Sequence, residues 1–88
     1  MKLMMAIVQD ADANRVVDAL TAENFGVTRI NTAGGFLKRG NATLLAGVED
    51  DQVQVVKDLI DRHCERRGDA VSHAATVFVL GVKDFVRL

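Results

Sequence analysis

Six apolar residues in succession, from Leu3 to Val8, stand almost at the start of this 88-residue chain. The run is too short for a buried helix, and it lacks the polar alternation of a strand with one face in water. It therefore predicts a central strand, covered on both faces or on one face and by a second subunit on the other. A similar run, Thr76 to Leu80, predicts a fourth and last strand.

Two amphipathic helices are predicted between these runs. The first spans Ala13 to about Glu23, with Asp10 or Asp12 as its N-cap, and the second follows the acidic triplet at 49–51. Apolar residues recur in both at a spacing of three to four, which places them on one helix face. They are Ala13, Val16, Val17 and Leu20 in the first helix, and Val53, Val56, Leu59, Ile60 and Cys64 in the second.

Two further strands are predicted at Val27 to Asn31 and at Ala42 to Val48, joined as a hairpin. The order strand, helix, strand, strand, helix, strand is the split β-α-β pattern. We therefore expect an α+β fold of the ferredoxin-like βαββαβ type, in which two helices cover one face of a four-stranded antiparallel sheet. A single domain over residues 1–88 is expected.

The charge balance argues against a partner that is a polymeric nucleic acid. Eleven basic and twelve acidic residues give a net charge of −1, so no overall basic field exists. Neither a membrane-spanning run nor a cleavable leader is apparent, and the single cysteine, Cys64, fits a reducing compartment. The sequence predicts a cytoplasmic protein that does not bind membranes.

The hairpin connection has an unusual composition. Gly34-Gly35, Phe36-Leu37, Lys38-Arg39, Gly40 and Asn41 follow one another within eight residues. Glycines allow close approach to the backbone, and an aromatic tip beside cations and an amide suits a flat, anionic ligand. The other interpretation is a glycine-rich turn whose Phe36 and Leu37 fold back on their own domain.

The sequence contains no recognisable catalytic or metal-binding pattern. No carboxylate pair, Cys-His dyad or metal cluster stands at recognisable spacing, and His63 and His73 are isolated. We expect no enzyme activity, no metal and no cofactor. Two alternatives stay open: a small enzyme with its active site at a subunit interface, or a structural assembly module without a ligand.

Several segments together resemble the PII-like cyclic di-AMP receptor proteins, which are similar to the nitrogen-regulatory PII signal proteins. These segments are Met5 to Asp10, Asn24-Phe25, Thr28, Gly34 to Leu37, Gly40-Asn41, Thr43, Gly47-Val48 and Ala75 to Val79. The resemblance runs nearly end to end, and Gly-Gly-Phe-Leu-x-x-Gly-Asn is its most specific part. It implies a homotrimeric signal-transduction receptor that binds cyclic di-AMP or a related adenine nucleotide between subunits and relays this to an unknown protein target.

The resemblance also implies the ligand-binding residues, which are Asn24, Thr28, Gly35, Phe36, Leu37, Asn41 and Gly47. In this assignment Phe36 and Leu37 form one wall of the site, and Asn41 supplies an amide. The chain departs from the family in two places. Gly26 stands where these receptors commonly carry an arginine, and the segment Glu65 to Ala74 is much shorter than their long loop.

Overall fold

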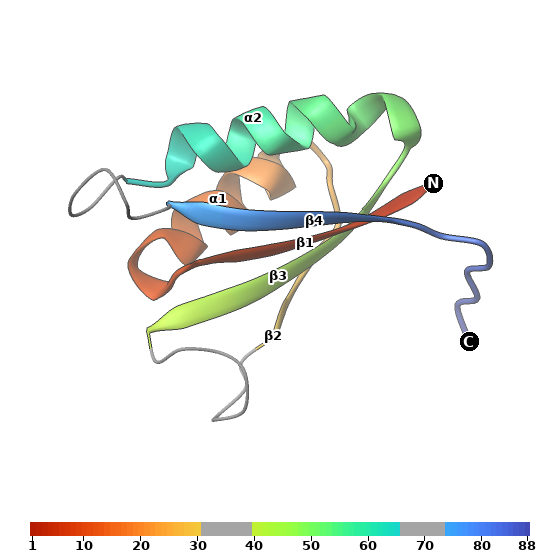
Figure 1. Ribbon diagram of the computed structural model, residues 1–88, viewed down its shortest axis with the longest axis horizontal. Coiled ribbons are helices and arrows are strands. Elements are labelled where there is room, and N and C mark those ends of the chain that lie inside the picture. Colours follow the sequence, from red (N-terminus) through yellow and green to blue (C-terminus); the bar gives the residue numbers. More distant parts are fainter. Residues whose placement is uncertain (31–39, 66–73) are drawn as a thin grey trace.

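The computed structural model describes residues 1–30, 40–65 and 74–88. In these residues the elements follow the predicted order, so the ferredoxin-like βαββαβ fold is confirmed (Figure 1). The strands are β1 (Lys2–Gln9), β2 (Val27–Ile30), β3 (Asn41–Val48) and β4 (Ala75–Gly81). The helical segments are α1 (Asp10–Ala22), the short 3₁₀ helix η1 (Asp50–Gln52) and α2 (Val53–His63).

The four strands form one antiparallel sheet in the order β2-β3-β1-β4. β1 is a central strand, as its apolar run predicts, and it pairs with β3 over its whole length. Its other side pairs with β4, from Lys2 opposite Gly81 to Val8 opposite Ala75. The two predicted strands around the hairpin connection, β2 and β3, pair with Thr28 opposite Leu45.

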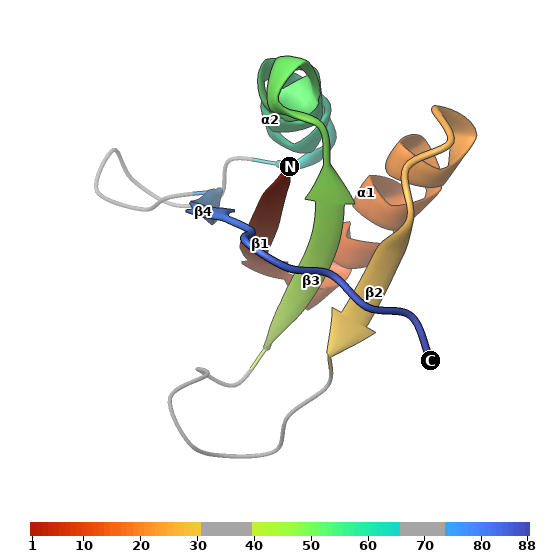
Figure 2. The same ribbon diagram turned by 90° about the vertical axis from the view of Figure 1, so that its right-hand side faces the viewer.

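The helices cover one face of the sheet, and the core lies between them (Figure 2). Alternate residues of the two central strands point to this face, and burying their apolar surface is the main favourable contribution to folding. The least exposed large side chains of the core are Met4, Val8, Val16, Leu20, Leu44 and Val56. Cys64 is also buried, as expected for a small apolar residue.

Helix α1 begins at Asp10, three residues before the predicted start, and its N-cap is Gln9. The prediction of Asp10 or Asp12 as the capping residue was wrong, because no side chain caps this helix. Asp12 is instead fully buried in the first turn, where its carboxylate accepts a hydrogen bond from the Arg15 guanidinium. A carboxylate in the first helical turn is also stabilised by the positive end of the helix dipole.

The chain leaves α1 through a left-handed residue and enters β2. Asn24 has φ 67°, and the amide of Phe25 donates to the carbonyl of Leu20 at 3.0 Å. The helix therefore ends where the sequence predicts, and Asn24 supplies the left-handed conformation. Gly26 has no positive φ, so its backbone does not require glycine.

The C-terminal segment, residues 82–88, continues from β4. The amide of Val82 donates to the carbonyl of Met1 at 3.2 Å, which holds the start of this segment beside β1. From there the segment crosses the end of the sheet towards β2 (Figure 2). It carries the exposed apolar side chains of Phe85, Val86 and Leu88.

Candidate functional site

A cavity of about 470 Å³ lies where β2 begins and β3 ends. Residues from four parts of the fold surround it: the N-terminal end of β1, the start of β2, the end of β3 and the C-terminal segment. The lining residues are Met1, Leu3, Gly26, Val27, Thr28, Leu45, Ala46, Gly47 and Arg87. We call this space the β2–β3 cavity.

Strand register explains why these residues meet. Thr28 lies opposite Leu45 in the β2–β3 pair, and Leu3 lies opposite Gly47 in the β1–β3 pair. Side chains that alternate along a strand and pair across strands share one face of the sheet. Thr28, Leu45 and Leu3 therefore project from the face that the helices leave uncovered, which we call the open face.

Two glycines of this cavity have different structural roles. A Cβ atom added to Gly47 would lie 3.0 Å from Cε of Met1, so this glycine leaves room for the Met1 side chain. A Cβ atom added to Gly26 would meet nothing within 4 Å. The space in front of Gly26 is therefore open, and a larger side chain at this position would extend into it.

The cavity has one charged side chain among its lining residues, that of Arg87. Its guanidinium lies 5.8 Å from the centroid of the Phe85 ring, and it forms no ion pair with a carboxylate of residues 1–30, 40–65 or 74–88. The Met1 ammonium group, by contrast, lies 3.1 Å from Asp50 Oδ1. A hydrogen bond from this ammonium group lowers the pKa of Asp50, with smaller contributions from its charge and that of Lys2.

The structure brings together two of the predicted ligand-binding residues, Thr28 and Gly47, which both line the β2–β3 cavity. Asn24 is exposed at the end of α1 and does not line it. Asn41 starts β3, six residues before Gly47, so the two are about 20 Å apart along the strand. Gly35, Phe36 and Leu37 lie outside the described residues.

Sequence reasoning missed Arg87, which stands 61 positions after Gly26 in the chain. One signal was present, a single cation within the apolar sequence Phe-Val-Arg-Leu at 85–88. The sequence does not predict which part of the sheet this arginine reaches, because its position depends on the backbone path of residues 82–88. The cavity also includes Leu45, an ordinary strand residue in the sequence.

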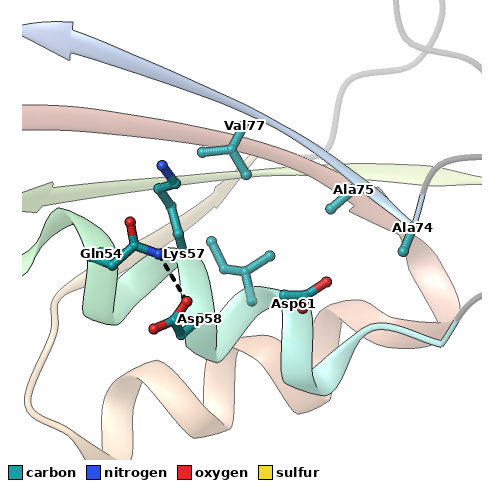
Figure 3. Close-up of a pocket in the computed structure, with 8 residues that line it drawn as sticks. Gln54, Lys57, Asp58, Asp61, Ala74, Ala75 and Val77 are labelled. Carbon is teal, nitrogen blue, oxygen red and sulfur yellow. Dashed lines mark hydrogen bonds between the residues drawn. The ribbon is translucent and has the colours of Figure 1, made fainter.

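A second cavity, of about 320 Å³, lies between α2 and β4. Figure 3 shows that its polar side chains, Gln54, Lys57, Asp58 and Asp61, come from α2, whereas Ala74, Ala75 and Val77 form the opposite wall. Gln54 Nε2 donates to Asp58 Oδ1 at 2.9 Å, so part of this polar row is satisfied within the helix. Of the predicted ligand-binding residues that the structure describes, none lines this cavity.

The open face of the sheet carries an apolar patch at its β1–β4 side. Met5, Ile7, Phe78 and Leu80 surround a hollow of about 320 Å³ there, and Phe78 and Leu80 are 49% and 47% exposed. Exposed apolar patches of this kind are typical of interaction surfaces. We call these four residues the open-face patch.

The described part of the chain contains neither a metal-binding cluster nor a membrane-spanning helix. No group of three or more His, Cys, Asp or Glu side chains in residues 1–30, 40–65 and 74–88 is placed to hold a metal ion. Of the described helices, none has the length and apolar character needed to cross a membrane.

Comparisons with known proteins agree with the resemblance seen in the sequence. A family model described as "Cyclic-di-AMP receptor" matches residues 1–75. Among solved structures, the chain is similar to a functionally unknown protein from Pediococcus pentosaceus ATCC 25745. The two share 37% sequence identity with a TM-score of 0.81, over 99% of this chain and 96% of the other.

Proposed function

We propose that this chain, which belongs to the cyclic-di-AMP receptor family, binds cyclic di-AMP or a related adenine nucleotide at the β2–β3 cavity. Receptors of this family are signal proteins, so the chain is a receptor and not an enzyme. We further propose that the ligand site lies at the β2–β3 cavity, that the protein is a homotrimer and that it relays ligand binding to a protein partner.

The observation that carries the proposal is the composition of the cavity. Thr28 offers a hydroxyl, Leu3 and Leu45 offer apolar surface, and Arg87 is the single charged side chain among the lining residues that the structure describes. Nucleotide sites need the same three elements: apolar surface against the base, a polar group for orientation and a cation or amide groups for phosphate. The uncompensated positive charge favours an anionic ligand.

The remaining predicted ligand-binding residues lead us to propose a site shared between subunits. Asn41 starts β3 about 20 Å from Gly47, because a strand advances about 3.3 Å per residue. One nucleotide contacts both regions most readily if Thr28 and Gly47 come from one subunit and residues 35–41 from its neighbour. The open-face patch supplies apolar surface for this assembly, which we propose is a homotrimer.

In this proposal the ligand state passes to a protein partner through residues 32–41, because the segment Glu65 to Ala74 is too short for the role of a long loop. Hydrogen exchange with and without nucleotide tests this. Protection is expected mainly in residues 32–41 upon binding, and protection mainly in residues 65–74 would contradict it.

Calorimetry with cyclic di-AMP tests the binding site. Saturable binding of about one ligand per subunit is expected, and Thr28→Val should weaken it about 10- to 150-fold, because a lost hydrogen bond to a charged group costs about 1.5–3 kcal/mol. Thr76→Val is the matched control. Thr76 is an exposed residue on the same face of the sheet, but it does not line the cavity.

The alternatives give different results in the same experiment. A structural module without a ligand would release no heat with cyclic di-AMP, cyclic di-GMP or ATP. A site elsewhere in the molecule would bind cyclic di-AMP equally well in wild type and Thr28→Val. Either result, with a folded protein, contradicts the proposal.

A further inference from the structure

We propose that Arg87 holds a phosphate of the bound nucleotide and supplies the positive charge that Gly26 lacks. This inference rests on the proposed function and adds a specificity-determining residue to it. Arg87 belongs to the C-terminal segment, whereas Gly26 precedes β2, and the two residues face the same space only in the folded chain.

The geometry of the β2–β3 cavity allows Arg87 to supply the positive charge that is absent at residue 26. Gly26 and Arg87 both line it, and a Cβ atom at Gly26 would meet no atom within 4 Å. The absence of a side chain at residue 26 therefore leaves space within the cavity that Arg87 also lines. Two oxygens of a phosphate placed in the cavity can accept two parallel hydrogen bonds from the guanidinium group.

The charges around the cavity point to the same role. None of the lining residues within 1–30, 40–65 and 74–88 is acidic, and the other positive group there, the Met1 ammonium, is 3.1 Å from Asp50. Arg87 has the Phe85 ring 5.8 Å away but no carboxylate partner in the described part of the chain. An arginine without a counter-ion, beside apolar surface, attracts an anion more strongly than one in a surface ion pair.

The sheet holds the start of the segment that carries Arg87. β4 pairs with β1 as far as Gly81 opposite Lys2, and the Val82 amide extends the pairing to the Met1 carbonyl. The chain then crosses the end of the sheet towards β2 (Figure 2). The position of the cation therefore depends on a backbone contact at Met1, which itself lines the cavity.

Calorimetry with cyclic di-AMP and four variants tests the role of Arg87. Arg87→Ala should weaken binding about ten-fold, and Arg87→Lys should weaken it less, because a lysine keeps the charge but loses the planar fork. Lys83→Ala is the matched control: it removes a cation from the same segment that does not line the cavity. Gly26→Arg in the Arg87→Ala protein should restore affinity.

The dependence of binding on salt gives a second measurement. Each contact between a cation and a phosphate makes binding weaker as salt rises, so Arg87→Ala should reduce the salt dependence while Lys83→Ala leaves it unchanged. Unchanged affinity and salt dependence in Arg87→Ala, with a wild type that binds, would overturn the role of Arg87 alone. No binding by the folded wild type would overturn both this inference and the proposed function.

Discussion

At the level of single residues, Thr43 is notable because its buried side chain carries a hydroxyl group without a hydrogen-bond partner in the described part of the chain. Thr43 is 4% exposed, and its hydroxyl has no hydrogen-bond partner among the described residues. It lies on the open face of β3, opposite Ile7 of β1 and Ile30 of β2. A buried hydroxyl without a partner costs about 1–3 kcal/mol of stability.

Replacing this hydroxyl with a methyl group should therefore stabilise the protein. Thr43→Val is expected to raise the free energy of unfolding by about 1 kcal/mol, because valine has nearly the same shape and removes the unpaired group. Urea denaturation measures the change. Thr76→Val, at an exposed threonine of β4, is the control and should change little. A loss of stability in Thr43→Val would show that the hydroxyl has a partner.

The predicted ligand-binding residues illustrate which single positions a sequence can reveal. Thr28 and Gly47 were predicted through a family resemblance, and register places both at one cavity. Arg87 could not be found this way, because its position depends on the path of residues 82–88 and not on a local pattern. Gly26 was recognised as a departure, but only the open space beside it shows what its small size allows.

At the level of elements, the two helices begin in different ways. α1 has no side-chain cap, whereas the entrance to α2 has a capping box between Glu49 and Gln52. The amide of Glu49 donates to Gln52 Oε1 at 3.0 Å, and the Glu49 carboxylate accepts from the backbone of Gln52. The acidic triplet at 49–51 correctly predicted a helix start, but the sequence did not separate η1 from α2.

Removing this capping box should destabilise the protein. Glu49→Ala is expected to lower the free energy of unfolding by about 1 kcal/mol, since the backbone amide of Gln52 loses its hydrogen bond to the Glu49 carboxylate. Gln54→Ala is the control. It breaks only the exposed hydrogen bond to Asp58 on α2 and should cost about 0.2–0.5 kcal/mol. Equal losses in the two variants would contradict the importance of the capping box.

At the level of the whole molecule, the sheet has one face under helices and one face open. The helix-covered face was predictable, because two amphipathic helices must bury their apolar stripes against something apolar. The open face was predictable only in part: the unbroken run Leu3 to Val8 indicates that both faces of β1 are apolar, but not what covers the second face. The surface available for subunit contacts is formed by several strands together, so the oligomeric state cannot be predicted from the sequence of one strand.

The proposed trimer leads to a test at this level. Phe78→Asp places a charge in the open-face patch and should dissociate the assembly into monomers, because burying an unpaired carboxylate is costly. Light scattering measures the mass, and circular dichroism checks the fold. Val55→Asp is the control, since Val55 is also 49% exposed but lies on α2. A wild type that is a monomer at micromolar concentration would refute the trimer and the shared site.

The pairing of Lys2 with Gly81 has a consequence for how the chain acquires its structure. β1 leaves the ribosome before the other three strands, and both of its neighbours in the sheet, β3 and β4, follow much later in the chain. Synthesis at about 5–20 residues per second leaves the apolar β1 unpaired for seconds. Contacts between residues so distant in sequence also slow the search for the native state. β1 is therefore the segment of the nascent chain most exposed to aggregation, and the one that most needs protection until β4 has been made.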